Sequence, residues 1–110
     1  MGERTDIPPG TLYMLILKTL ARHGKLHGYE IAGVIQQNSE EVLQVEEGSL
    51  YPALQRMLLK GWVKAEWGVT AGNRRARYYQ LTAAGRKRLE VELEQYHRVN
   101  TAIQKVLGTT

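Results

Sequence analysis

The sequence contains no cysteine among its 110 residues. This absence excludes a disulfide framework, a thiol nucleophile and a cysteine-rich zinc site. Long apolar runs are also missing: the longest covers residues 12–17, whereas a membrane-spanning helix needs roughly 18 residues. The N-terminus carries Glu3 and Asp6 and lacks the basic-then-apolar order of a secretory signal. We therefore expect a cytoplasmic protein with a single domain of ordinary size.

The sequence also lacks the patterns that support catalysis or metal binding. Gly68 and Gly72 are not followed by the Gly-Lys-Ser/Thr of a phosphate-binding loop. His23 and His27 are four residues apart, but Gly24 interrupts the helix that would align them on one metal ion. No nucleophile is paired with a general base. We predict that the protein is not an enzyme, and we expect neither a metal site nor a cofactor.

Acidic residues are absent from one long segment. Between Trp67 and Leu89 the chain has six basic residues and no acid, although its net charge is only +4. A basic segment on a mildly acidic body is typical of a protein that binds a polyanion. Charge alone leaves an alternative, which is a solvated helix face beside a basic loop. The six residues are Arg74, Arg75, Arg77, Arg86, Lys87 and Arg88.

The first helix is predicted to begin at Leu12 and to end at Gly24, which acts as a left-handed cap. The helix is apolar on two sides, and both sides must be buried. In so small a protein, we expect a partner chain to cover the second side. One side consists of Leu12, Leu15, Ile16 and Leu20, and the other of Tyr13, Met14 and Leu17.

Two further helices are predicted, one from His27-Gly28 through Asn38 and one from near Gly48-Ser49 to Lys60. A short extended patch at residues 42–45 separates them. Pro52 places the start of the third helix, because proline is tolerated only in a first turn. Apolar spacing predicts that Leu50, Leu54, Met57 and Leu58 are buried, while Pro52, Gln55, Arg56 and Leu59 form the opposite face with Tyr51 on the flank.

A two-stranded hairpin follows, because residues 62–67 alternate like a strand and residues 77–81 are rich in strand-favouring types. Residues 68–75 form a basic loop between the strands. Thr82 is predicted to cap a final helix, and Gly85 weakens its first turn. That helix carries a heptad seam in which Asn100 is the polar position. The apolar members of the seam are Leu89, Leu93, Tyr96, Ile103 and Leu107.

This order of elements predicts a mainly helical fold with a small β-hairpin, namely a winged helix-turn-helix followed by a long C-terminal helix. We expect residues 1–81 to form the winged helix domain with an N-terminal arm and residues 82–110 to form a dimerisation helix, as one structural unit. In a winged helix, the third helix enters the DNA major groove and the hairpin contacts the flanking backbone or minor groove. The fold also occurs in protein-binding domains, so it does not settle the function.

Four motifs resemble the PadR family of bacterial transcriptional regulators. They are Gly10-Thr-Leu-Tyr-Met-Leu-Ile-Leu-Lys-Thr-Leu20, His27-Gly-Tyr-Glu-Ile31, Gly48-Ser-Leu-Tyr-Pro-Ala-Leu54 and Tyr79-Gln-Leu-Thr-Ala-Ala-Gly85. The single helix after Thr82 resembles the short form of the family. The resemblance implies a homodimeric DNA-binding repressor, often released by a small-molecule effector. It also implies that Tyr29 and Tyr51 contact phosphates.

The candidate DNA-binding residues lie on the second helix, the third helix and the hairpin. A tyrosine hydroxyl near a helix N-terminus can donate to a phosphate oxygen, and the alternative is a ring packed in the core. Gln55 suits adenine and Arg56 suits guanine or a phosphate, unless both lie on an ordinary solvated face. Ser49 could cap the third helix instead. The full set is Tyr29, Ser49, Tyr51, Pro52, Gln55, Arg56, Asn73, Arg74, Arg75 and Arg77.

We expect the last helix to pack against the first helix of a second copy, with Asn100 fixing the register. The alternative is a last helix that folds back on its own domain. The predicted dimer interface consists of Leu12, Tyr13, Ile16, Leu89, Leu93, Tyr96, Asn100, Ile103 and Leu107.

The sequence therefore predicts a transcriptional regulator, most simply a repressor that binds a pseudo-palindromic operator as a homodimer. The expected partners are double-stranded DNA, a second copy and an unidentified small-molecule effector, with no membrane. One alternative is a winged helix module that binds a protein partner and no specific DNA. Structured RNA is a weaker alternative, because an A-form groove admits the third helix poorly.

Overall fold

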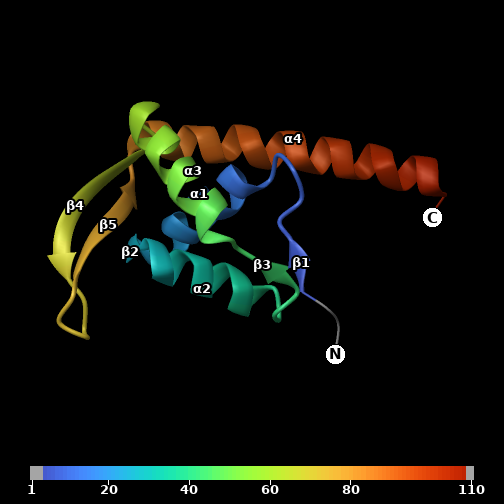
Figure 1. The fold of residues 1–110 in the computed structure, drawn as a ribbon. Coiled ribbons are helices and arrows are strands. Elements are labelled where there is room, and N and C mark those ends of the chain that lie inside the picture. The colour runs from blue at the N-terminus through green and yellow to red at the C-terminus, as the bar shows by residue number, and fades with distance from the viewer. Residues whose placement is uncertain (1–3, 109–110) are drawn as a thin grey trace.

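The computed structural model describes residues 4–108. The predicted segments 1–81 and 82–110 include residues 1–3 and 109–110, which lie outside the described residues. Figure 1 shows α4 running along one side of the domain and extending past it. No described helix is long and apolar enough to cross a bilayer. The elements confirm a winged helix-turn-helix with a long C-terminal helix. In order they are β1 (Thr5–Asp6), α1 (Leu12–His23), β2 (Lys25–His27), α2 (Gly28–Asn38), β3 (Leu43–Gln44), α3 (Glu47–Leu59), β4 (Val63–Val69), β5 (Arg75–Leu81) and α4 (Ala83–Leu107).

Helix α1 is the central helix of the domain. It contacts α2, α3, α4 and β5, and Met14, Ile16, Leu17 and Leu20 are all buried. Most of both apolar sides is therefore covered within one chain, where α4 packs across α1, while Leu12, Tyr13 and Leu15 are half-buried. Contrary to the prediction, Met14 and Leu17 on the second side are buried without a partner chain. The helix ends as expected at Gly24, whose φ is +83°, although its ψ of −85° lies outside the left-handed helical region.

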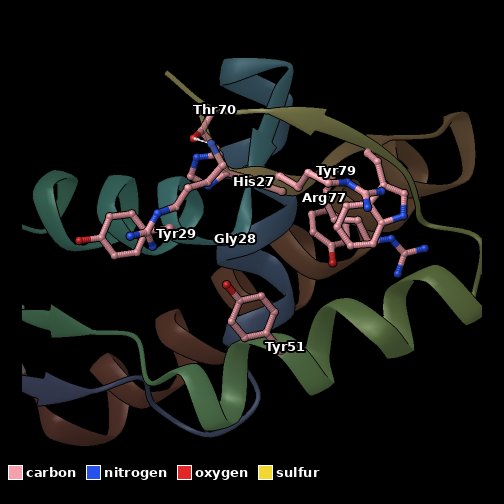
Figure 2. Close-up of a pocket in the computed structure, with 11 residues that line it drawn as sticks. His27, Gly28, Tyr29, Tyr51, Thr70, Arg77 and Tyr79 are labelled. Carbon is pink, nitrogen blue, oxygen red and sulfur yellow. Dashed lines mark hydrogen bonds between the residues drawn. The ribbon is translucent and has the colours of Figure 1, made fainter. Parts of the chain in front are cut away.

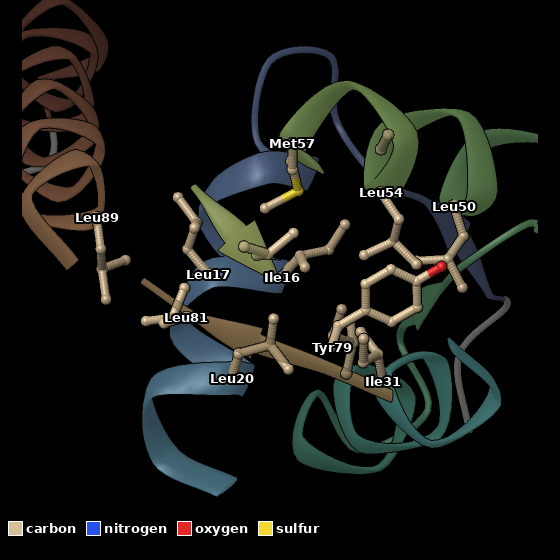
Figure 3. Close-up of a cluster of buried hydrophobic side chains, with 13 residues drawn as sticks. Ile16, Leu17, Leu20, Ile31, Leu50, Leu54, Met57, Tyr79, Leu81 and Leu89 are labelled. Atoms are coloured by element: carbon tan, nitrogen blue, oxygen red, sulfur yellow. The ribbon is translucent and has the colours of Figure 1, made fainter. Parts of the chain in front are cut away.

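The core lies between α1, α2, α3 and the base of the hairpin (Figure 3). Leu50, Leu54 and Met57 are almost completely buried, which confirms the predicted inner face of α3, while Leu58 is half-buried at its edge. Full burial of such a side chain contributes roughly 1.5–3 kcal/mol. This packing fixes which side of α3 faces away from the domain.

Helix α3 begins earlier than its proline predicts. Its N-cap is Glu46, so Ser49 lies in the first turn and the predicted Ser49 cap is wrong. Pro52 lies inside the helix rather than in its first turn. Because Pro52 has no N–H, it cannot donate to the carbonyl of Gly48, and buried Leu50 and Leu54 on the same helix compensate for that loss.

The sheet has three strands in the order β2-β5-β4, and both pairings are antiparallel. Strand β2 was not expected from the sequence. The hairpin strands are also longer than predicted, because β4 reaches Val69 and β5 begins at Arg75. Gly68 belongs to the strand and not to the loop. A Cβ at Gly68 would lie 2.8 Å from the Tyr78 ring, which covers this position.

Helix α4 docks onto the base of the hairpin. Thr82 accepts a hydrogen bond from the backbone N–H of Gly85 (3.0 Å), as the predicted cap requires, and donates one to the carbonyl of Gly61 (2.6 Å). Gly85 is buried, and a Cβ there would overlap the carbonyl oxygen of Trp62. The expectation that Gly85 only weakens the helix start is therefore corrected, because glycine allows the close approach of α4 to the hairpin.

The predicted extended patch at residues 42–45 contains β3, which pairs in parallel with β1. The ion pair between Arg4 and Glu41 (3.0 Å) adds a second link at the same place. The N-terminal arm is thereby attached to the connection between α2 and α3.

Candidate nucleic-acid interface

A groove of about 820 Å³ opens between the start of α2, helix α3 and the hairpin (Figure 2). Three arginines line it together with three tyrosines, a tryptophan and His27, and none of the 11 described residues that line it is acidic. A concave surface of one charge sign concentrates ligands of the opposite sign. The groove therefore suits a polyanion with planar groups. The arginines are Arg74, Arg75 and Arg77, and the aromatic residues are Tyr29, Tyr51, Tyr79 and Trp67.

Tyr29 and Tyr51 both reach the surface, with exposed fractions of 80% and 44%. The alternative that either ring packs into the core is therefore excluded. The Tyr51 ring lies over Gly28 at the start of α2, where a Cβ would be 2.9 Å from the Tyr51 hydroxyl oxygen. The glycine thus brings this hydroxyl to the first turn of α2. Hydroxyl and helix N–H groups in such an arrangement are donors suited to a phosphate.

The start of α2 is fixed by a reciprocal cap. The Nδ1 atom of His27 accepts from the backbone N–H of Glu30 (3.3 Å), and the Glu30 carboxylate accepts from the backbone N–H of His27 (3.0 Å). Histidine occupies the position that serine or threonine usually takes in this motif. The His27 ring also packs edge-on against Tyr78 of β5, at 5.3 Å between centroids. Helix α2 is therefore anchored to the hairpin on one side of the groove.

One face of β5 passes from the core to the groove. Alternate residues share a face of a strand, and along this face Leu81 and Tyr79 are buried, Arg77 is half-buried and Arg75 is exposed. The same packing that places Leu81 in the core therefore directs the two arginines into the groove. No described acid forms an ion pair with either arginine.

Tyr79 forms part of the groove floor. Burial raises the pKa of the Tyr79 hydroxyl, the charge of Arg77 partly offsets the rise, and Tyr51 adds to it. The phenol therefore keeps its proton at neutral pH and remains a hydrogen-bond donor beside the arginines.

Trp67 is a groove residue that the sequence-based set missed. It lies opposite Arg77 in the strand register, and 61% of its surface is exposed. The guanidinium carbon of Arg75 is 4.7 Å from its ring centroid, and that of Arg77 is 5.9 Å away. The alternation of residues 62–67 was a signal that could have found it, since Trp67 follows Val63 on the face that points to the core.

Asn73 shapes the tip of the hairpin. Its φ is +63°, and its backbone N–H donates to the carbonyl of Thr70 (2.9 Å). The Thr70 hydroxyl in turn accepts from the N–H of Arg74 (3.2 Å). A residue in the left-handed region is typical of a three-residue hairpin loop, and asparagine tolerates it well. Among the predicted hairpin contacts, Arg74 lines the groove and Asn73 holds the turn.

The outer face of α3 adjoins the groove. Pro52 and Gln55 are exposed there, as predicted, and Ser49 is exposed as well, although the groove itself is lined only by Tyr51 from this helix. Arg56 is placed differently: its Nε atom donates to the Tyr13 hydroxyl (2.6 Å), and its guanidinium lies 5.9 Å from the Tyr13 ring. The structure thus directs Arg56 toward α1, and Arg56 does not line the groove.

The residues predicted for a dimer interface divide into two groups. Ile16 and Leu89 lie in the core of their own domain, with 0% and 8% exposed, so they have no surface to offer a second chain. Their inclusion is corrected for that reason. Leu12, Tyr13 and Leu93 pack partly against the same core, and Asn100 is half-buried. The exposed group is Tyr96, Ile103 and Leu107, joined by Val99 and Val106.

Among the described residues, no cluster of three or more histidine, aspartate or glutamate side chains could hold a metal ion. The donors gathered in the groove are guanidinium and phenol groups. Such groups bind anions and planar rings rather than cations.

Comparison with known proteins identifies the family. The model of the transcriptional regulator PadR-like family matches residues 16–91. A transcriptional regulator from Clostridium thermocellum is 29% identical with a TM-score of 0.79, over 87% of this chain and 92% of that chain. A PadR family transcription regulator from Clostridium difficile is 30% identical with a TM-score of 0.75, over 89% and 99%.

Bacillus subtilis PadR, solved in complex with operator DNA, has the same fold, with a TM-score of 0.67 and 24% identity over 78% of this chain and 48% of that chain. The family match, over residues 16–91, includes every residue that lines the groove. The chain therefore belongs to the PadR-like family of transcriptional regulators, which are DNA-binding proteins and not enzymes.

Proposed function

We propose that this protein is a repressor that binds a pseudo-palindromic operator as a homodimer. The observation that carries the proposal is the acid-free groove, in which three arginines and two exposed tyrosines adjoin the outer face of α3. Bacillus subtilis PadR, which shares the fold, was solved in complex with operator DNA, and this supports DNA as the ligand. Release by a small-molecule effector is the remaining part of the proposal and follows from the family resemblance.

In the proposed complex, positioning and reading are done by different residues. Tyr29, Tyr51 and Arg74 contact phosphates and set the register of the domain on the duplex. The outer face of α3 enters the major groove, where Gln55 pairs with the N6 and N7 atoms of an adenine. Arg75 at the hairpin contacts the adjacent backbone or a narrow minor groove.

The exposed apolar side chains of α4 support the homodimer. Tyr96, Val99 and Ile103 are roughly half exposed, and Val106 and Leu107 are still more exposed. A second copy could bury this apolar stripe, because a twofold axis places the same stripe of each chain against the other. Twofold symmetry of such a dimer gives an operator with two related half-sites.

Selection from fragmented genomic DNA with the purified protein tests the proposal. We expect the recovered duplexes to share one motif that contains two related half-sites. Recovery without a shared motif, together with affinity that does not depend on salt, would favour the protein-binding module instead.

Substitutions then separate positioning from reading. Gln55→Ala should weaken operator binding by about 1–3 kcal/mol and random DNA far less. Arg74→Ala should weaken both DNAs alike and lower the salt slope by about 0.9. Lys64→Ala is the matched control, because Lys64 is an exposed cation on the same hairpin that does not line the groove. Equal effects of Arg74→Ala and Lys64→Ala would contradict the assignment of the groove.

A further inference from the structure

Trp67 has no role in the DNA contacts described so far, yet it is the largest side chain in the groove. Its indole is 61% exposed, so burial in the core does not explain a tryptophan at this position. An exposed tryptophan ring can instead serve as a stacking partner for neighbouring cationic side chains.

The two nearest cations are the arginines that point into the groove. The Arg75 guanidinium carbon lies 4.7 Å from the indole centroid and that of Arg77 lies 5.9 Å from it, so both are within the range of a cation–π contact. Arg77 is the register partner of Trp67 on the neighbouring strand, and Arg75 is two residues nearer the tip on the same face. One indole therefore contacts both arginines of β5.

We propose that Trp67 is a positioning residue for DNA binding, which holds the guanidinium groups of Arg75 and Arg77 in the groove in the orientation that phosphate oxygens require. The role rests on the proposed function of the groove. A guanidinium stacked on a ring is held through its face, and its N–H edge stays free to donate to an anion. Trp67 itself need not touch DNA.

The absence of a competing partner strengthens the case. Within residues 4–108 no carboxylate forms an ion pair with Arg75 or Arg77. Without the indole, both side chains would sample many rotamers, and binding would have to immobilise them. Stacking orders them before DNA arrives, so less conformational entropy is lost on association.

The test measures affinity for the operator and for random duplex DNA in Trp67 variants. Trp67→Ala and Trp67→Leu should each bind both DNAs about tenfold more weakly, which corresponds to losing the pre-ordering of two arginine side chains. Leucine still covers the neighbouring side chains with an apolar group but has no π face. Equal losses of DNA affinity in Trp67→Leu and Trp67→Ala would therefore show that stacking of the arginines, and not apolar contact, is what matters. Trp67→Tyr keeps a π face and should retain most of the affinity.

A double-variant cycle isolates the coupling. In a chain that already carries Arg75→Ala and Arg77→Ala, we expect Trp67→Ala to reduce DNA affinity no further. A full additional loss would show that the indole contacts DNA itself and would overturn the positioning role. Parental affinity of Trp67→Leu would overturn it as well, because stacking would then contribute nothing.

Trp62→Leu is the matched control. Trp62 is also stacked by cations, Lys60 at 5.3 Å and Arg88 at 5.0 Å, but it lies outside the groove. We expect Trp62→Leu to lower the melting temperature and to leave DNA affinity unchanged. Trp67→Leu should instead lower DNA affinity and leave the melting temperature unchanged. An equal loss of affinity in both variants would overturn the local role of Trp67. If the parent shows no salt-dependent DNA affinity, the proposed function fails first, and this role fails with it.

Discussion

The groove and the distal half of α4 are both exposed, but their chemistry is opposite. The groove gathers arginines and aromatic rings with no acid among its described residues. The distal half of α4 exposes valine, isoleucine and leucine side chains along one stripe. The first surface suits a polyanion and the second suits another apolar surface. Under the proposed function, one small domain presents a face for DNA and, at a distance from it, a face for a second copy.

The boundary between the core of the domain and the exposed apolar stripe falls inside α4. Leu89 and Ile103 occupy the same predicted seam of α4, yet 8% of Leu89 is exposed and 50% of Ile103. The seam is continuous in the sequence, whereas the domain beneath it ends (Figure 1). The proximal part of the seam therefore belongs to the core, and the distal part stays exposed, where the proposed second copy would pack.

The largest effect is expected from a charge placed on the distal stripe. Ile103→Asp should convert the proposed dimer into a monomer and weaken operator binding by about a hundredfold or more, because two linked half-site contacts become separate events. Light scattering and a binding titration measure the two effects. Thr101→Asp places the same charge on the opposite side of the exposed helix and should leave both unchanged. A monomeric parent with high operator affinity would contradict the assignment.

The next largest effect is expected at the contact between α4 and the base of the hairpin. Gly85→Ala places a Cβ onto the carbonyl oxygen of Trp62, so α4 must shift on the hairpin. Overpacking of this kind should lower the free energy of unfolding by about 2 kcal/mol. Chemical denaturation measures it. The control is Ala84→Gly at the neighbouring exposed position, which should cost no more than about 1 kcal/mol of helix propensity. An equal cost for both variants would mean that the close approach is not needed.

A smaller effect is expected at the contact between Tyr13 of α1 and Arg56 of α3. Tyr13→Phe and Arg56→Ala each remove the hydrogen bond between the Tyr13 hydroxyl and Arg56, which should lower the unfolding free energy by about 1 kcal/mol. The double variant should lose less than the sum, because both changes break one contact. Strict additivity in denaturation experiments would show that this contact contributes nothing to stability and that Arg56 is free to serve the groove side.

The smallest effect is on pH dependence. Burial raises the pKa of Tyr79 above its usual value near 10.0, so the folded state binds this proton more tightly than the unfolded state. The resulting stabilisation is complete below the unfolded pKa and is lost as the pH rises through the folded pKa. Tyr79→Phe should therefore flatten the decline of the melting temperature in alkaline solution. An identical alkaline decline in parent and variant would refute this contribution.

The sequence predicted what depends on local pattern. The buried and exposed faces of α3, the Thr82 cap and the basic hairpin all follow from residue spacing and turn chemistry, and the structure has each of them. What escaped prediction depends on partners distant in the chain. Strand β2 is too short to show alternation and exists because β5 offers it an edge.

Long-range contacts also decide two site residues. Arg56 is diverted by Tyr13, which lies 43 residues away in sequence, so its place on the outer face of α3 did not reveal its direction. Alternation places Trp67 on the same face as Val63, but its stacking with Arg75 and its register with Arg77 make it a groove residue. Periodicity places a side chain on a face, and the neighbouring element determines what it contacts there.

The docking of Gly85 against Trp62 has a geometric consequence for the proposed dimer. Helix α4 has 25 residues and is therefore about 37 Å long, and its N-terminal end is docked at the base of the hairpin. If α4 tilted by only about 5° at its docked end, its C-terminal end would move by about 3 Å. In the proposed dimer the far end would join the two copies, so the spacing between their α3 helices would depend in part on the close approach that Gly85 allows.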